Sequence, residues 1–379
     1  MTALIKSIIF EKLQKMNWNL FFVFCLLFFV GLAMLYSAGG GNMEPWAKKQ
    51  LIYFLIFLPV VFLIALIDIN FWFKTSYLIY FGGVGLLLLV EIIGHKSMGA
   101  TRWINFGFFR LQPSETMKIA LILGLAKYFF RRDLSEIRQT KYLILPTIMF
   151  LIPFALILNQ PNLGTALILF FITGIIYFCS GVQTWKFVFC LVCVLVASPI
   201  IWKYGIKDYQ KQRVMTFLHP DKDLLKTGYN IMQSKIAIGS GGIRGKGFLK
   251  GTQGQLEFLP EKQTDFIFTT LCEEGGFIGA MCTILLFCII FGYLVYIGTK
   301  CQHNYGRIIV VGILSNLFFH FFINIGMISG ILPVVGTPLP LLSYGGSITA
   351  TSLISLGFVL NVDLHKTAVI KDNKNNIIF

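Results

Sequence analysis

Charged residues are scarce in this sequence. They make up 13% of its 379 residues, which is about half the share found in a typical soluble domain. Hydrophobic residues make up 56%, and the mean hydropathy is +0.75. This composition excludes an ordinary soluble protein of this length and predicts a polytopic integral membrane protein.

Patterns for disulfides, metals and nucleotides are also missing. The eight cysteines lie mostly in apolar runs, and the one CxxC, Cys190 to Cys193, has no second pair. The glycine-rich segment 239–255 resembles a phosphate loop, but Ser240 and Gly247 occupy positions where a Walker motif needs Gly and Ser or Thr. We interpret this segment as a flexible basic loop that could move around a long substrate.

What the sequence has instead is apolar stretches of spanning length, which for a helix is about 20 residues. They predict an all-α fold with about ten transmembrane helices and a large extracytoplasmic loop, about 204–264, between helices 7 and 8. The predicted spans are 18–38, 50–67, 75–93, 114–129, 143–158, 163–180, 185–203, 275–298, 307–326 and 347–362.

The distribution of Lys and Arg predicts the orientation. With a cytoplasmic N-terminus, fourteen of them fall in inner segments and five in short outer loops, as the positive-inside rule requires. The long loop holds eleven more, but long segments are largely exempt from the rule. Both termini are therefore predicted to be cytoplasmic. We assign the net charge of +15 to such loops and to sites for anionic substrates, not to nucleic acid.

Asp265 lies where the polar loop meets the next apolar helix, in the stretch LPEKQTDFIFTTLCEE (259–274). An ionisable residue at membrane depth is a candidate functional residue, although Asp also caps helices. Glu273 and Glu274 follow eight and nine residues later and could line the same cavity or pair with Lys118 or Arg102. The sequence alone leaves these alternatives open.

Cationic residues lie in two of the predicted outer loops and in the helix that follows the first of them. Arg102 lies in the loop before a helix that starts at Pro113, and Glu115 and Lys118 follow on one face of that helix. Lys118 could form a structural ion pair, contact an anion, or do both. Arg213 lies among lysines in the long loop.

Two further segments complete the candidate site. Segment 228–238 has apolar residues at helical spacing, which predicts a short helix on the membrane interface or on the protein's outer face. Segment 330–346, GILPVVGTPLPLLSYGG, contains three prolines that prevent a continuous helix. Irregular backbone at membrane depth lines a cavity or is buried in protein, and Ser343 supplies a hydroxyl there.

Taken together, these motifs resemble the SEDS family of shape, elongation, division and sporulation proteins. The resemblance covers the whole chain in order, as one membrane domain at 1–366 with a short cytoplasmic tail at 367–379. The elongation branch (RodA) is more similar than the division branch (FtsW). One departure is Asn162, where the family usually has Asp, so Asn162 is left out of the catalytic set. The motifs are QPSE with Lys118, QPNLGT, GYNIMQSKIAIGSGG, LPEKQTDFIF and GILPVVGTPLPLLSYGG.

The resemblance implies a peptidoglycan glycosyltransferase of the bacterial cytoplasmic membrane, which polymerises lipid II into β-1,4 glycan strands during cell elongation. It implies a class B penicillin-binding protein, a transpeptidase, as the partner. It also matches the family's catalytic aspartate to Asp265.

The chemistry of such a reaction agrees with these residues. A hydroxyl acceptor needs a general base, which typically contributes about 100- to 10,000-fold, and Asp265 is the candidate. Cations would stabilise the departing pyrophosphate, so Lys118, with its neighbour Glu115, Arg102 and Arg213 are candidate substrate-binding residues together with Ser343. A divalent cation, Mg²⁺ or Mn²⁺, could share that role, but no ligands are assigned. A precursor flippase and a non-catalytic scaffold for a transpeptidase remain as alternative functions.

Overall fold

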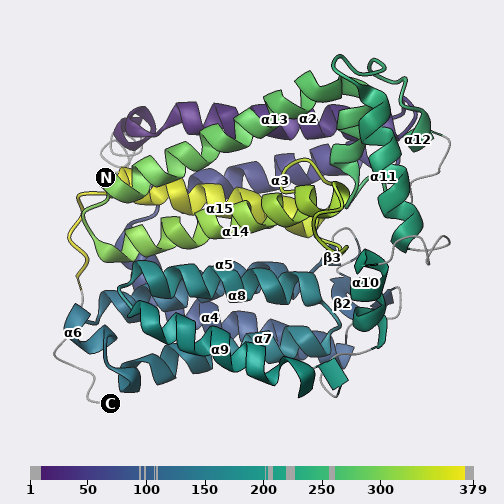
Figure 1. Cartoon of the computed structure of the whole chain (residues 1–379). Coiled ribbons are helices and arrows are strands. Elements are labelled where there is room, and N and C mark those ends of the chain that lie inside the picture. Colours follow the sequence, from purple (N-terminus) through teal and green to yellow (C-terminus); the bar gives the residue numbers. More distant parts are fainter. Residues whose placement is uncertain are drawn as a thin grey trace.

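The computed structural model describes residues 10–93, 95–97, 100–105, 107, 110–200, 202–203, 208–218, 227–255 and 261–371. Within these ranges, ten long helices run side by side in a bundle (Figure 1). They are α2 (Trp18–Ala38), α3 (Ala47–Leu66), α4 (Ile69–Ile93), α5 (Pro113–Phe130), α7 (Ile144–Asn159), α8 (Leu163–Cys179), α9 (Thr184–Ile200), α13 (Ile267–Lys300), α14 (Asn304–Ile328) and α15 (Gly346–Leu364).

Length and composition make this a membrane bundle. Seven spans in the described chain are long and apolar enough to cross a membrane, and α8 and α9 are shorter apolar helices. The tenth helix, α5, has 18 residues but carries Glu115, Lys118 and Lys127. The prediction of a helical polytopic membrane protein is confirmed.

The predicted spans agree closely with most of the helices, and α2 has the predicted limits. The largest difference is at α13, which begins at Ile267, eight residues before the predicted start at 275. The reason is Gly276, whose φ of +63° breaks the helix into two segments. The first segment, 267–275, is the part that the prediction missed.

The connections gather at the two ends of the bundle. We call one the loop end; it carries α10 (Asp208–Leu218), α11 (Thr227–Gly241), α12 (Thr252–Gln255) and a small antiparallel sheet (Figure 1). The sheet was not predicted; its strands are β1 (His95–Ser97), β2 (Ala100–Asn105) and β3 (Arg110–Leu111). We call the other the terminal end; it carries α6 (Leu134–Ile137) and a 3₁₀ turn, η1 (Thr140–Leu143).

Both ends of the described chain lie at the terminal end. Lys12 Nζ donates to the Leu66 carbonyl at 2.9 Å, and the Lys371 backbone N–H donates to Asn70 Oδ1 at 2.8 Å. The two chain ends therefore meet at the turn between α3 and α4. The predicted tail, 367–379, is described only as far as residue 371.

The centre of the bundle is formed by α14 and α15. Of the apolar window in α15, 89% is buried inside the protein, against 28% in α3. Small side chains allow this burial, because they let helices approach closely in membranes. At Gly357, an added Cβ would lie only 3.0 Å from the Val61 carbonyl oxygen of α3. The central helices thus hold the loop end in a fixed position.

Segment 228–238 forms part of α11, as predicted. Ile231, Ser234 and Ala237 are buried, while Met232 and Ile236 are exposed. Ser234 Oγ contacts Thr269 Oγ1 of α13 at 2.8 Å and donates to the Ile328 carbonyl of α14 at 3.1 Å. Of the two predicted placements, the helix packs on the protein itself.

Candidate active site

Asp265 lies at the loop end, in a turn at 261–266 that leads into α13. Its carbonyl oxygen accepts a hydrogen bond from Asn324 Nδ2 of α14 at 2.9 Å, and the same amide donates to the Thr337 carbonyl at 2.8 Å. Behind it, Phe266 and Ile267 are buried. The apolar residues after Asp265 therefore anchor the turn in the core, while Asp265 itself is half-buried.

The surroundings of Asp265 favour its neutral form. The pKa of Asp265 is raised from 3.8 to about 7, chiefly by burial and also by the neighbouring carboxylate of Glu261, while the Arg213 guanidinium acts in the opposite direction. A carboxyl group with a pKa near 7 is well matched to proton transfer at neutral pH. The turn thus provides an acid–base group, with a cation from α10 close enough to influence it.

Segment 330–345 forms a wall beside Asp265. Ser343 Oγ donates to the Thr264 carbonyl at 2.5 Å and accepts from the Leu339 N–H at 2.7 Å. The Tyr344 N–H donates to the Gln263 carbonyl at 2.8 Å.

 That backbone hydrogen bond joins the wall directly to the Asp265 turn. Ser343 is buried, so its hydroxyl holds the wall in place, and its predicted contact with substrate stays a prediction.

The wall is also fixed from the opposite side by Gln50 of α3. Its Nε2 donates to the Ser343 carbonyl at 3.1 Å and to Thr349 Oγ1 at 2.9 Å, and its Oε1 accepts from the Gly345 N–H at 3.1 Å. The prediction that segment 330–346 is irregular and placed against the site is consistent with this arrangement. Gln50 is completely buried. Its amide supplies hydrogen bonds to backbone N–H and C=O groups that have no helical partner, because the prolines prevent a helix in this segment.

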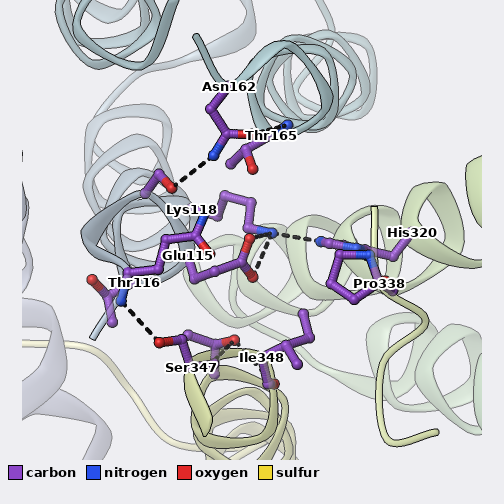
Figure 2. A network of polar contacts seen from close by, with 12 residues as sticks. Glu115, Thr116, Lys118, Asn162, Thr165, His320, Pro338, Ser347 and Ile348 are labelled. Carbon is purple, nitrogen blue, oxygen red and sulfur yellow. Dashed lines mark hydrogen bonds and ion pairs between the residues drawn. The ribbon is translucent and has the colours of Figure 1, made fainter. Parts of the chain in front are cut away.

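Lys118 forms a buried network below the wall (Figure 2). Its Nζ donates to both Glu115 carboxylate oxygens, at 3.0 and 2.9 Å, and contacts His320 Nε2 at 2.5 Å. His320 Nδ1 lies 3.0 Å from the Pro338 carbonyl oxygen. A neutral imidazole that donates from Nδ1 and accepts at Nε2 satisfies both contacts.

This geometry supports the structural role proposed for Lys118. Its side chain is 0% exposed, so a substrate phosphate could reach it only by displacing Glu115 or His320. The predicted anion contact of Lys118 and the predicted substrate contact of Glu115 stay predictions. What the network does is connect α5 to α14 and, through Pro338, to the wall beside Asp265.

Asn162, which replaces the family's usual Asp, lies next to this network (Figure 2). Its Nδ2 donates to Ser114 Oγ at 3.3 Å, and its Oδ1 accepts from the Thr165 N–H at 3.5 Å. Asn162 therefore caps α8 and ties it to the first turn of α5. An amide suits this position because it donates to the hydroxyl as well as accepting from the backbone.

Arg102 of β2 also contacts the turn between α7 and α8. Its Nε donates to the Gln160 carbonyl at 3.0 Å, and its Nη2 donates to the Pro161 carbonyl. Two of the guanidinium nitrogens thus already donate to carbonyl oxygens of the protein. Its predicted role toward substrate stays a prediction.

The glycine-rich segment is held firmly, which contradicts our interpretation of it as a flexible loop. Glu273 Oε1 accepts from Lys246 Nζ at 2.6 Å and from the Thr252 N–H at 2.8 Å. Glu274 accepts from Ser37 Oγ at 2.5 Å and from the Leu249 N–H at 3.2 Å. The two acids therefore pair with neither Lys118 nor Arg102. They fasten this segment over the break in α13.

Gly245 and Gly276 make this close packing possible. Both have positive φ, +76° and +63°, and their backbones lie against each other, so that a Cβ on either would overlap the other segment. Replacing Gly245 with alanine is expected to lower the free energy of unfolding by about 1–3 kcal/mol. Thermal unfolding of the purified protein measures the effect.

Gly242→Ala is the matched control for this prediction. Gly242 also has positive φ, +55°, but no atom lies within 4 Å of an added Cβ. This variant carries only the backbone cost of about 1–2 kcal/mol. If both variants lost the same stability, the close approach at Gly245 would not contribute.

Sequence reasoning missed three polar residues on one face of α14. Asn316, His320 and Asn324 recur every four residues and are all buried. That spacing in an apolar helix was a readable signal, because i and i+4 positions share a face. In addition, Thr337 Oγ1 and Asn324 Oδ1 are buried without a hydrogen-bond partner among the described residues. Unsatisfied polar atoms so close to Asp265 are typical of a functional site.

Known proteins are similar to this chain over nearly its whole length. The chain is 39% identical over 370 residues to "Peptidoglycan glycosyltransferase MrdB" of Escherichia coli (strain K12), covering 97% of this chain and 98% of the relative. It is 30% identical over 410 residues to "Peptidoglycan glycosyltransferase RodA" of Treponema pallidum (strain Nichols), covering 88% and 94%.

Two solved structures are similar over nearly the whole fold. One is described as "Structural coordination of polymerization and crosslinking by a peptidoglycan synthase complex"; its TM-score is 0.81 at 28% identity, covering 93% of this chain and 99% of that one. The other is the crystal structure of Thermus thermophilus rod shape determining protein RodA, with a TM-score of 0.70 at 26% identity, covering 93% and 97%. The family model for FtsW, RodA and SpoVE, described as "Cell cycle protein", matches residues 13–368. The chain therefore belongs to the FtsW/RodA/SpoVE family.

Proposed function

We propose that this protein is a peptidoglycan glycosyltransferase that polymerises lipid II into β-1,4 glycan strands, with Asp265 as the general base. The observation that carries the proposal is the Asp265 carboxyl group, held at the loop end with its pKa raised to about 7. Curated relatives covering nearly the whole chain are named for the same activity. The polymerisation would serve cell elongation.

Asp265 would remove the proton from the acceptor hydroxyl as that oxygen attacks the anomeric carbon of the donor. The bond that forms joins this oxygen to the sugar, and the bond that breaks releases the lipid pyrophosphate. Direct displacement inverts the anomeric centre and gives a β-linked product. The anchored turn holds the base in place before substrate arrives, which reduces the entropic part of the barrier.

Arg213 is the cation that we assign to the departing pyrophosphate. It influences the Asp265 carboxyl group directly, whereas Lys118 and Arg102 are engaged with protein oxygens. A cation here stabilises negative charge that grows in the transition state. Arg213 belongs to α10, which lies at the same end of the bundle as the sheet (Figure 1).

A divalent cation such as Mg²⁺ or Mn²⁺ stays part of the proposal without assigned ligands. Among the described residues, no group of three His, Cys, Asp or Glu side chains gathers in one place. Mg²⁺ is often held by one or two carboxylates together with substrate phosphates, so the residues present would leave most of its coordination to the substrate.

The site would face the outside of the bacterial cytoplasmic membrane, with both termini in the cytoplasm. The excess of Lys and Arg in the segments of the terminal end supports this orientation. A class B penicillin-binding protein would be the partner that crosslinks the product. The similar structure that describes polymerisation together with crosslinking supports a partner of that class.

The test is polymerisation of purified lipid II by the full-length protein with its cognate transpeptidase and Mg²⁺. Glycan ladders on a gel are the expected result. A flippase would instead move lipid II across vesicles without forming ladders, and a scaffold would do neither. Absence of ladders with an active, correctly assembled complex would contradict the proposal.

The rate of polymerisation is expected to rise with pH through about 7 and then level off. A general base must be deprotonated, and the raised pKa of Asp265 places that transition near neutrality. Below it, the rate should fall about tenfold per pH unit. Initial rates of ladder formation between pH 5.5 and 8.5 measure the profile.

Two variants test whether the pH profile reports the titration of Asp265 and not that of another group. Glu261→Gln should move the midpoint to lower pH, because Glu261 raises the pKa of Asp265, and Arg213→Gln should move it to higher pH, because Arg213 lowers that pKa. The readout is the pH at the midpoint of the rate profile. It can be compared between variants even if their maximum rates differ. A midpoint that neither variant moves would assign the titration to another group.

A further inference from the structure

A cavity of about 840 Å³ lies in the bundle at the terminal end, away from Asp265. It opens between α5, α8, α13 and α14, and α6 forms part of its rim. Ligand-binding cavities typically measure about 300–1,000 Å³. Along α14 it reaches from Asn304 to Leu314, about 15 Å of helix, whereas His320 and Asn324 of the active site lie nearer the other end.

The interior of the cavity is apolar. Buried side chains at its base include Phe129 of α5, Leu294 of α13 and Val310 of α14. At its edge, Leu134 of α6 is 61% exposed and Val295 of α13 is 52% exposed. In a membrane these edge residues face lipid, so the interior is continuous with the surrounding hydrocarbon.

The rim is cationic. Arg132 and Arg307 line the cavity together with one acid, Asp133. Arg132 lies over the rings of Tyr128 and Tyr142 and pairs with Glu136 at 3.4 Å, so its position is fixed. Arg307 is exposed, and its Nε donates to the Cys301 carbonyl at 2.7 Å. Such a rim suits an anion.

Ser180 supplies an independent sign of a ligand. It lines the cavity, it is 8% exposed, and its Oγ has no hydrogen-bond partner among the described residues. A buried hydroxyl without a partner is uncommon in proteins. A polar headgroup at this position would satisfy it.

We propose that this cavity binds an anionic phospholipid from the adjacent membrane leaflet, with its phosphate at Arg132 and Arg307 and an acyl chain in the apolar interior. Basic pockets between transmembrane helices commonly bind anionic lipid headgroups. Exposed edge residues let a chain enter sideways from the bilayer. A soluble anion would make no favourable contact with the apolar interior, whereas the acyl chain of a lipid would fill it. The site is separate from the catalytic one.

The test is native mass spectrometry of the delipidated full-length protein, titrated with phosphatidylglycerol or with phosphatidylcholine. We expect one tightly retained phosphatidylglycerol per chain and at least tenfold weaker retention of phosphatidylcholine. Arg132→Gln/Arg307→Gln should weaken phosphatidylglycerol binding at least tenfold. Arg138→Gln/Lys141→Gln, which removes the same charge outside the cavity lining, should not.

A second pair of variants tests the apolar interior. Gly298 lines the cavity, and a Cβ there meets only Val310, at 3.6 Å or more, so Gly298→Leu fills space without a backbone clash. Gly292→Leu adds the same side chain to the same helix where nothing lies within 4 Å. Only the first should weaken lipid binding, and thermal unfolding shows that each variant folds.

Three outcomes would overturn the proposal. Equal retention of both lipids would remove the role of the arginines. Equal effects of Gly298→Leu and Gly292→Leu would place the lipid on the outer surface. Full displacement of phosphatidylglycerol by inorganic phosphate would show a site for a free anion.

Discussion

Replacing Asp265 with asparagine is expected to reduce lipid II polymerisation by about 100- to 10,000-fold, the usual contribution of a positioned general base. The amide has nearly the same size as the carboxyl group but cannot accept the proton. The backbone contact with Asn324 uses the Asp265 carbonyl oxygen, so the turn should keep its conformation. Ladder formation by the complex with its transpeptidase measures the loss.

Thermal unfolding provides the second readout for this variant. Because the folded-state pKa of Asp265 is raised, its contribution to stability is fully present below the unfolded pKa, about 3.9, and is lost as pH rises through about 7. Asparagine has no such dependence. At pH 8 the variant should therefore be at least as stable as the wild type.

Glu261→Gln is the control, since it removes an acid from the same turn without removing the proposed base. It should retain polymerisation. Ladders from Asp265→Asn at the wild-type rate would remove Asp265 from the chemistry. Attention would then move to Glu261, Glu273 and Glu274.

Replacing Lys118 with methionine is expected to lower the free energy of unfolding by about 3–5 kcal/mol, the usual effect of removing one partner from a buried ion pair. Methionine fills a similar volume, but Glu115 would keep a buried charge with no cation beside it. His320 would lose its contact as well. Thermal unfolding of the purified protein in detergent measures the change.

The double variant Glu115→Gln/Lys118→Met should recover much of this loss, because it leaves no unpaired charge. Lys48→Met serves as a control, since Lys48 and Glu44 form an ion pair with both side chains more than half exposed, and such pairs contribute about 0–1 kcal/mol. A Lys118→Met protein of full stability that no longer binds lipid II would contradict the structural role. It would support the predicted contact with the substrate's anion.

The sequence predicted features that depend on neighbouring residues. The limits of α2 follow from one largely apolar run between Asn17, which caps its first turn, and Gly39. Asp265 stood out because placing an acid directly before an apolar membrane helix costs free energy, so that such a residue is a candidate functional residue. The irregular wall followed from its prolines.

What could not be predicted depends on residues far apart in the chain. Glu273 pairs with Lys246, twenty-seven residues earlier, across the break at Gly276, and no spacing rule indicates that pair. Lys118 meets His320 across 202 residues, so the choice between an ion pair and an anion contact needed the fold. The small sheet joins short strands whose apolar pattern is too brief to recognise.

The break at Gly276 has a mechanical consequence. Segment 267–275 is fastened to α11 on one side, through Ser234 and Thr269, and leads directly into the Asp265 turn on the other. The remaining part of α13 is joined to it through Gly276 and also through the glycine-rich segment, because the Phe277 and Ile278 N–H groups donate to the Gly242 and Ile243 carbonyls at 2.9 and 3.1 Å. The glycine-rich segment therefore bridges the break, because it is hydrogen-bonded to Glu273 and Glu274 on one side of Gly276 and to Phe277 and Ile278 on the other. A change in the position of this segment would reach both parts of α13, and through the first part the turn that carries Asp265.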